Sequence, residues 1–308
     1  MEDKNWKGHL ALLVAYFIFG LNTPLSKYVL AHGEISALAL TFYRFAGAAL
    51  LFWMLSLWTK RETVPWRDIL LLFLASLFGI FINQLSFVAG LSVTSPIDAS
   101  VITTLGPVMT MILASVFLKE PITGKKITGV LIGAAGAFLL IFHGNAGRLN
   151  IHSLEGNLLC MLSCASFALY LTLFKKLIVR YRVVTLMKWM FLFATLCSLP
   201  FCWQDTVRVD YAALPAGIYL RIAYVVVMAT FCSYFLIPVG QKFLRPTIVS
   251  MYNYLQPLVS SLVAVVLGMD AFGWVKSAAT LLIFLGVYVV IQSKSRAQME
   301  KMSSQDEC

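Results

Sequence analysis

Charged side chains are scarce in this sequence. Only 12% of its 308 residues are Asp, Glu, Lys or Arg, whereas 60% are hydrophobic and the mean hydropathy is +0.83. Soluble domains are about 25% charged, and a soluble chain of this length could not bury so much apolar surface. The composition therefore excludes an ordinary soluble protein and indicates that lipid solvates the excess apolar surface.

Motifs for metal binding and catalysis are also missing. The six cysteines show no C-x-x-C spacing, so neither a zinc site nor a disulfide framework is indicated. The sequence contains no nucleotide-binding loop, H-E-x-x-H or G-x-S-x-G, and its four histidines lie near the ends of apolar runs or between them. We expect no metal, no cofactor and no enzymatic activity; an intramembrane enzyme and a channel are the weaker alternatives.

The net charge of +10 could attract nucleic acid. The basic residues, however, are spread through short gaps between apolar runs, as in the cytoplasmic loops of membrane proteins. We expect membrane lipids and a small-molecule solute as partners, and no nucleic acid.

Apolar runs of about 20 residues, the length that crosses about 30 Å of hydrocarbon, recur along the whole chain. They predict an all-α membrane protein with transmembrane helices near 9–31, 37–58, 69–90, 96–118, 124–142, 155–175, 183–203, 217–240, 246–268 and 272–292.

The distribution of Lys and Arg predicts the orientation. The N-terminus, the even-numbered loops and the C-terminus hold 17 of these residues, and the odd-numbered loops hold three. Because basic loops stay on the cytoplasmic side, we expect both termini in the cytoplasm of a bacterial cell, with the chain in the cytoplasmic membrane.

The sequence repeats itself with a shift of 150 residues, which places Pro96 over Pro246, Pro107 over Pro257 and Gly136 over Gly286. The predicted halves are 1–143 and 154–292, with five helices each, followed by a polar cytoplasmic tail at 293–308. Five is odd, so the second half enters the membrane inverted. Inverted repeats are typical of transporters that expose one central site alternately to either side; a duplication without functional meaning is the alternative.

The sequence resembles the EamA family of the drug/metabolite transporter superfamily. The resemblance rests on FGLNTPLSK at 19–27, Arg44-Phe45, TLGPV at 104–108, FLKEP at 117–121, and Gly129 with Gly136. It implies a ten-helix bundle that exports metabolites, amino acids or drugs through a cavity lined by helices 1, 3, 4, 6, 8 and 9. A carrier of nucleotide sugars or other phosphorylated metabolites from the same superfamily is the alternative.

The second half departs from the family pattern. It reads Asn253-Tyr254-Leu255-Gln256-Pro257 where the first half has Thr103-Thr104-Leu105-Gly106-Pro107, and Ala279 replaces Gly129. The first helix also lacks the membrane-embedded Glu of the small multidrug branch, which argues against carrying over that branch's proton-coupled mechanism.

Polar side chains within the predicted helices are candidates for a cavity, because an amide in hydrocarbon needs a partner or water. Hydrogen bonds that join helices to each other are the alternative role. The candidates for substrate binding are Asn22, Arg44, Asn83, Gln84, Thr103, Thr104, Tyr170, Tyr234, Asn253 and Gln256.

Three prolines fall within predicted helices: Pro24, Pro107 and Pro257. Proline removes a backbone hydrogen bond and kinks a helix. The three residues are candidate hinges, with static bends as the alternative.

Two charges lie inside or near the membrane region. Arg44 is about seven residues into the second helix, about 10 Å deep at ~1.5 Å per residue, and should face a partner or a cavity. Asp98 is a candidate partner. Arg44 could bind a substrate carboxylate or brace an outer gate, and Asp98 could couple protons or cap its helix.

The fifth predicted helix carries Gly129, Gly133 and Gly136 on one face. Such a face indicates close helix packing, either within the chain or between subunits of an oligomer.

Overall fold

The computed structural model describes residues 2–31, 35–94, 99, 102–144, 154–266 and 274–293. All regular elements in these segments are helical. They are α1 (Glu2–Ala31), α2 (Ala37–Leu57), α3 (Trp66–Ser76), η1 (Leu77–Phe81), α4 (Ile82–Val93), α6 (Gly106–Phe117), α7 (Gly124–Gly144), α8 (Leu154–Leu173), α9 (Lys175–Arg180), α10 (Val183–Val207), η2 (Tyr211–Ala213), α11 (Ala216–Val226), η3 (Val227–Cys232), α12 (Ser233–Phe243), α13 (Pro246–Met251), η4 (Tyr252–Tyr254), α14 (Leu255–Val266) and α15 (Trp274–Ile291).

Six helical segments are long and apolar enough to cross a membrane, which makes the chain an integral membrane protein of the all-α class. They match six of the predicted helices and cover Asn5–Leu30, Ala37–Leu57, Trp66–Val93, Leu154–Leu173, Val183–Val207 and Ala216–Phe243. The other four predicted helices contain α6, α7, the α13–η4–α14 segment and α15.

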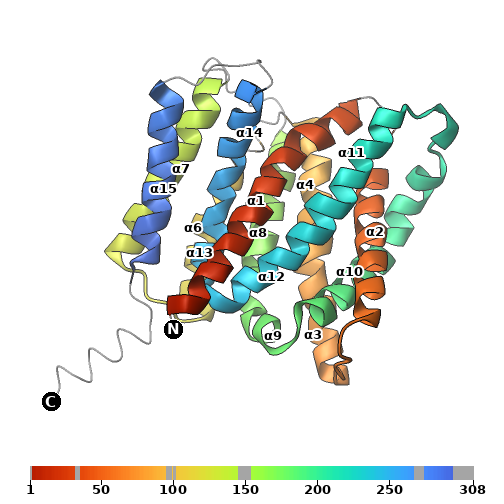
Figure 1. The fold of residues 1–308 in the computed structure, drawn as a ribbon, viewed down its shortest axis with the longest axis horizontal. Helices are drawn as coiled ribbons and strands as arrows, with labels where there is room; N and C mark the ends of the chain where they lie inside the picture. Colours follow the sequence, from red (N-terminus) through yellow and green to blue (C-terminus); the bar gives the residue numbers. More distant parts are fainter. Residues whose placement is uncertain are drawn as a thin grey trace.

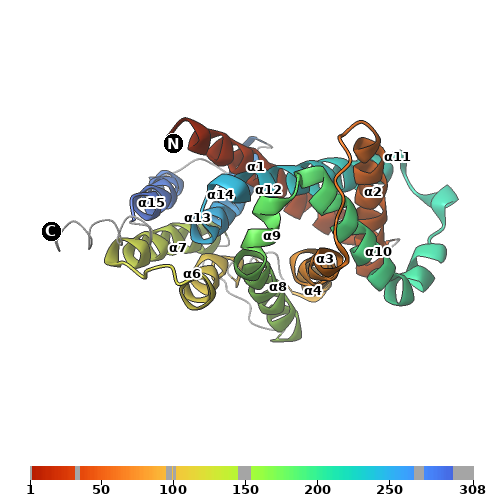
Figure 2. The same ribbon diagram turned by 90° about the horizontal axis from the view of Figure 1, so that it is seen from below.

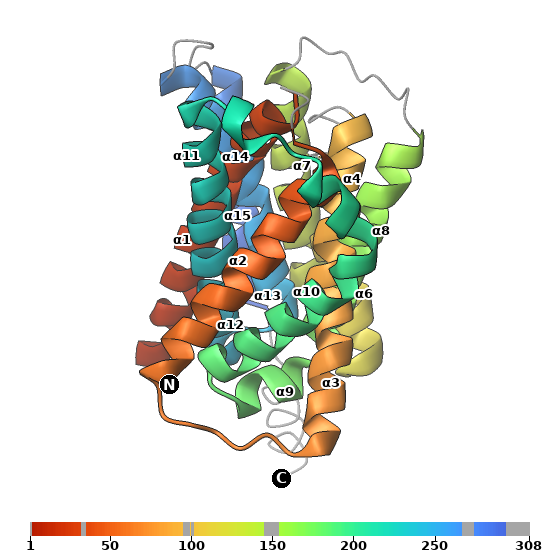
Figure 3. The same ribbon diagram turned by 90° about the vertical axis from the view of Figure 1, so that its right-hand side faces the viewer.

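The helices run side by side in an elongated bundle (Figure 1). α7 packs against α15 on one flank, and α2 packs against α10 on the other. Between these flanks α1 contacts α12 and α14, while α8 contacts α4 and α6. Figure 2 shows α7 and α15 at the edge opposite α2 and α10, and Figure 3 shows α2 and α10 crossing the face that turns toward the viewer.

The predicted helices 96–118 and 246–268 are not continuous, which corrects the expectation for two of the three prolines. Residues Thr104 and Leu105 form a turn before α6, and the 3-10 segment η4 separates α13 from α14. Pro107 therefore lies in the first turn of α6, and Pro257 is the third residue of α14. Proline is tolerated there because the first N–H groups of a helix have no intrahelical acceptor. Pro24 does lie inside α1. A hinge role for all three stays a prediction.

Two π-helical segments interrupt long helices. η1 lies between α3 and α4, and η3 lies between α11 and α12; their first residues, Leu77 and Val227, are 150 positions apart. Short π segments commonly occur at functional sites. Neither segment was expected, because no proline or polar motif marks it in the sequence.

Hydrogen bonds tie together the loops that the sequence assigns to one side. Lys175 donates to the carbonyl of Leu244 at 2.7 Å, and Arg245 donates to the carbonyl of Ser293 at 2.8 Å. We call this end of the bundle the basic end.

Loops assigned to the other side meet at the far end of the bundle. The Ser36 hydroxyl donates to Asp205 at 2.6 Å and also caps α2 by accepting from the backbone N–H of Ala39. Thr94 donates to Asn157 at 2.7 Å. The arrangement of the loops thus follows the pattern of basic residues.

A buried carboxylate organises the basic end. Lys126 Nζ lies 2.6 Å from Glu120 Oε2, with side chains 1% and 11% exposed. Burial lowers the pKa of Lys175 to about 8, and the negative charge of Glu120 opposes this shift. Glu120 likewise opposes the lowering of the Arg245 pKa by burial. One acid therefore compensates several basic groups from different parts of the chain.

The glycine face of α7 packs within the chain, which is one of the two roles that the sequence left open. A Cβ on Gly286 of α15 would lie 2.6 Å from the carbonyl oxygen of Gly129 and 2.5 Å from the backbone nitrogen of Gly133. A Cβ on Gly136 would lie 2.8 Å from the carbonyl oxygen of Ala279. Because α15 fills this face, it is not free for an oligomer contact.

Replacing Gly286 by Ala should lower the midpoint of thermal unfolding in detergent, because the added methyl would push apart two backbones in contact. We expect a loss of about 1–3 kcal/mol. The matched control is Gly124→Ala, since a Cβ there meets nothing within 4 Å and alanine is the better helix former. Equal stability of the two variants would contradict this packing.

Replacing Glu120 by Gln should destabilise the protein by about 3 kcal/mol or more, because Lys126 would be left buried without its counter-charge. The control is Glu62→Gln. Glu62 Oε1 lies 3.7 Å from Nε of the half-exposed Arg182, and ion pairs at the surface contribute at most about 1 kcal/mol. Thermal unfolding at neutral pH measures both, and a Glu120→Gln protein as stable as the control would overturn the assignment.

Candidate functional site

A central cavity lies between the two flanks of the bundle and encloses about 750 Å³ of empty space, counting the part that is open to solvent. Helices from both halves contribute to its wall. The lining residues are Tyr16, Phe19, Asn22, Arg44, Asn83, Gln84, Phe87, Thr103, Gly106, Thr110, Ser163, Cys164, Phe167, Tyr234, Asn253 and Gln256.

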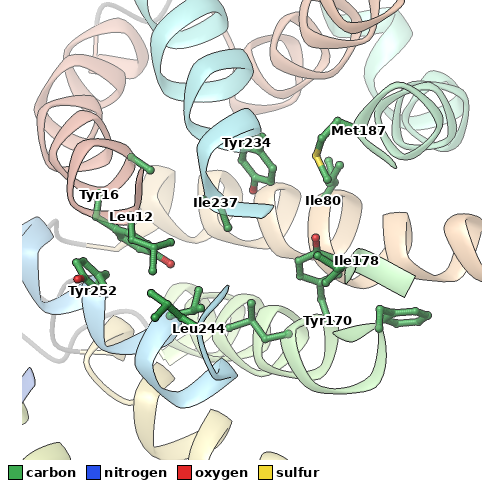
Figure 4. Close-up of a cluster of buried hydrophobic side chains, with 14 of the residues drawn as sticks. Leu12, Tyr16, Ile80, Tyr170, Ile178, Met187, Tyr234, Ile237, Leu244 and Tyr252 are labelled. Atoms are coloured by element: carbon green, nitrogen blue, oxygen red, sulfur yellow. The ribbon is translucent and has the colours of Figure 1, made fainter. Parts of the chain in front are cut away.

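Large buried side chains fill the bundle between the cavity and the basic end. Leu12 and Tyr16 of α1 lie beside Tyr252 and Leu244, while Tyr170 and Ile178 lie across the bundle from them (Figure 4). All these residues are at most 7% exposed. The cavity is therefore closed toward the basic end in the described part of the chain.

The structure brings eight of the ten predicted substrate-binding residues to the wall of this cavity. Tyr170 lies elsewhere, among the buried side chains between the cavity and the basic end, where its hydroxyl donates to Gln241 Oε1 at 3.2 Å. Thr104 is buried in the turn before α6 and does not line the cavity. Asp98 lies outside the described residues. Whether the eight residues bind substrate stays a prediction.

The side chain of Arg44 is 4% exposed and is held by Thr230 in the π segment η3, which precedes α12. Its Nε donates to Thr230 Oγ1 at 3.0 Å, and Thr230 in turn donates to the carbonyl of Val225 at 2.7 Å. Because the Thr230 hydroxyl donates its hydrogen bond to the carbonyl of Val225, its lone pairs can accept from the guanidinium. The partner seen for Arg44 among the described residues is thus Thr230.

The asparagine amides are largely engaged with the protein. Asn83 Nδ2 donates to the backbone and the side chain of Ser163, both at 3.0 Å, and its Oδ1 accepts from Tyr234 at 3.4 Å. These bonds tie α4 to α8 and α12, which is the alternative role that the sequence left open. Asn22 Oδ1 accepts from Ser26 at 3.1 Å, and Asn253 Oδ1 accepts from Gln256 at 3.2 Å.

Gln84 is different, because neither its Nε2 nor its Oε1 hydrogen-bonds to any described residue although the side chain is only 3% exposed. Gln84 is a neighbour of the Tyr234 hydroxyl, but not in hydrogen-bonding geometry. The Tyr16 hydroxyl on the same cavity wall is also buried and unbonded within the described residues. Buried polar groups are nearly always satisfied, so these two are positions where a ligand or water would bond.

The sequence analysis missed the apolar part of the wall. Tyr16, Phe19, Phe87 and Phe167 line the cavity, but a search for polar residues in apolar helices does not find them. Tyr16 and Phe19 pack edge to face at 5.8 Å, and Phe19 packs against Tyr234 at 6.0 Å. Only their helical spacing toward Asn22 and Asn83 could have indicated them.

Comparisons with known proteins agree with this architecture. An uncharacterized transporter of Archaeoglobus fulgidus is 27% identical over 92% of this chain and 98% of its own. YicL, an uncharacterized inner membrane transporter of Salmonella typhimurium, is 26% identical over 95% and 98%. A WAT1-related protein of Arabidopsis thaliana is 24% identical over 96% and 87%.

A crystal structure that is 17% identical aligns over 94% of this chain and 97% of that chain with a TM-score of 0.74, which shows a shared fold. The model of the EamA-like transporter family matches residues 6–142 and again residues 154–292. Together the two matches cover most of the chain, and the chain belongs to the EamA-like transporter family.

Proposed function

We propose that this protein exports small organic solutes by alternating access, with the central cavity as its substrate site. The observation that carries the proposal is a polar cavity within the membrane region, walled by helices of both halves and closed at one end. Metabolites, amino acids and drugs are the candidate solutes. Proton coupling through Asp98 is part of the proposal.

The proposed architecture is a ten-helix bundle of two inverted five-helix repeats, residues 1–143 and 154–292, with a cytoplasmic tail at 293–308. The 150-residue spacing of the two π segments and the double match of the family model support it. Two similar units of opposite orientation can pack in two nearly equivalent ways, and each packing would open the cavity to one side.

We place the basic end in the cytoplasm and the protein in the bacterial cytoplasmic membrane. The excess of Lys and Arg in the loops of that end supports this orientation, and the relative YicL is an inner membrane transporter. Since the cavity is closed toward the basic end, the conformation described here is one in which solute cannot reach the cytoplasm.

The alternative, a carrier of phosphorylated metabolites, finds less support in the cavity. A phosphate dianion is usually held by several basic groups. Arg44 is the single charged residue among the described lining residues.

Purified protein in liposomes should show saturable uptake and counterflow of a radiolabelled solute from a panel of amino acids, organic acids and amines. Counterflow distinguishes a carrier from a channel. Asn22→Ala and Asn253→Ala should raise KM about fivefold to tenfold, the effect of losing one hydrogen bond. Ser92→Ala is the control, because Ser92 is exposed and its hydroxyl donates to the carbonyl of Ala89 in its own helix. Unchanged KM in both cavity variants would remove this site.

Cysteine accessibility should reveal the orientation. In a background without native cysteines, Arg61→Cys and Lys176→Cys at the basic end should resist a membrane-impermeant thiol reagent in intact cells. Ser92→Cys and Arg208→Cys at the far end should react. All four positions are exposed, so burial would not obscure the result. Reaction of both sets from the same side would contradict the orientation and the inverted repeat.

A further inference from the structure

We infer that the solute carried in the central cavity is an organic monocarboxylate with an apolar body, and that the guanidinium of Arg44 binds its carboxylate. The inference rests on the proposed transport function and names the class of substrate. Four features of the cavity wall carry it: an uncompensated cation, a fixed guanidinium edge, an unbonded amide and an aromatic lining.

The first feature is the charge of the wall. Arg44 is 4% exposed, and its neighbours on the described wall include no Asp or Glu. An ion in a low-dielectric interior costs several kcal/mol unless a counter-ion approaches it. Within the described residues that counter-ion is missing, so a bound anion is the group that would compensate Arg44.

The second feature is the way the guanidinium is held. Thr230, in the π segment η3, accepts from Nε at 3.0 Å and is itself fixed by its bond to the carbonyl of Val225 in α11. Arg44 lines the cavity, and the paired terminal N–H groups of a guanidinium match the two oxygens of a carboxylate.

The third feature is the amide of Gln84, which lines the same cavity and has no hydrogen bond within the described residues. Its NH2 group and the hydroxyl of Tyr16 are two further donors without acceptors there. A carboxylate has about four acceptor positions, so it can accept from Arg44 and still have lone pairs for one of these donors.

The fourth feature is the aromatic lining. Phe19, Phe87 and Phe167 give the wall an apolar surface next to the polar groups. The apolar rings would bury the body of the solute, while Arg44 determines the charge of its head group.

Other head groups fit this wall less well. A primary ammonium ion would meet Arg44 without a carboxylate to compensate it, and a phosphate dianion would meet one basic residue where it usually meets several. A neutral amide would leave the charge of Arg44 buried without a counter-ion. The monocarboxylate alone matches both the sign and the size of the charge.

The test uses matched triples of solutes: an acid, its amide and the corresponding amine on one carbon skeleton. Suitable sets are 3-phenylpropionate, 3-phenylpropionamide and 3-phenylpropylamine, together with the analogous sets built on benzoate and 4-methylpentanoate. Saturable counterflow in liposomes at pH 7 is measured for each. We expect one or more acids to be carried with kcat/KM at least tenfold above those of the amide and the amine.

Arg44→Gln should reduce kcat/KM for the acid about 10- to 100-fold, the effect of losing a hydrogen bond to a charged group, and should remove the preference over the amide. Thr230→Val, which releases the guanidinium without removing its charge, should give a smaller loss in the same direction. Arg182→Gln, a loss of the same charge at a half-exposed site of the basic end, is the control and should change neither quantity.

Thermal unfolding and gel filtration of each variant separate misfolding from loss of recognition. If Arg44→Gln does not fold, Thr230→Val and Gln84→Leu carry the test, and an unchanged acid preference in both overturns the inference. Asp98→Asn completes the set. If the unmodified protein shows no acid preference and the Asp98→Asn variant does, Asp98 is the counter-ion of Arg44 and the inference is wrong.

The outcomes distinguish the inference from the proposed function. Saturable counterflow of amines or amides in preference to acids leaves the transport function standing and overturns the monocarboxylate. Non-saturable flux of every solute removes the carrier function, and the inference falls with it.

Discussion

The interior of a bilayer offers no water to a polar group, and this constraint decides where every buried hydrogen-bonding side chain of the protein lies. Asn83 reaches Ser163 and Tyr234, and Tyr170 reaches Gln241. At the central cavity, buried polar atoms of Gln84 and Tyr16 have no partner among the described residues, and outside its wall the same holds for Gln241 Nε2 and Thr247 Oγ1. The cavity is thus a region where two residues with unpaired polar atoms share one wall.

The flanks and the centre of the bundle solve the packing problem in different ways. At the α7–α15 contact, glycines bring the two backbones into van der Waals contact. Around the cavity, hydrogen-bonded amides and aromatic rings lie between the helices. The tightly packed α7–α15 flank joins the two predicted halves, because α7 belongs to the first and α15 to the second.

The sequence predicted the features that depend on composition and local pattern. Long apolar runs marked six membrane-crossing helices, and polar residues within the predicted helices marked eight of the 16 lining residues of the cavity, because both signals follow from the cost of polar groups in lipid. The resemblance to the EamA family also correctly indicated the family.

Features that depend on tertiary contacts were not predictable in this way. From the sequence, Pro107 predicts a kink, whereas the structure has a break in the helix just before Gly106. Tyr170 is predicted to line the cavity, but its hydroxyl binds Gln241 instead. The partner of the glycine face is α15 rather than a second subunit, which only the distances to Gly286 reveal. A search for polar residues in apolar helices could not identify the aromatic wall of Phe19, Phe87 and Phe167.

The π segments determine which way the cavity amides point. A regular α-helix turns by about 100° per residue, and a π segment accommodates one additional residue within its turn. Without the extra residue of Leu77–Phe81, Asn83 and Gln84 would be rotated by roughly a quarter turn about the helix axis relative to Trp66–Ser76. The same holds for Tyr234 after Val227–Cys232. A single inserted position in each long helix thus sets the azimuth of the binding groups, and moving that insertion beyond them would rotate them by roughly a quarter turn relative to the start of the helix.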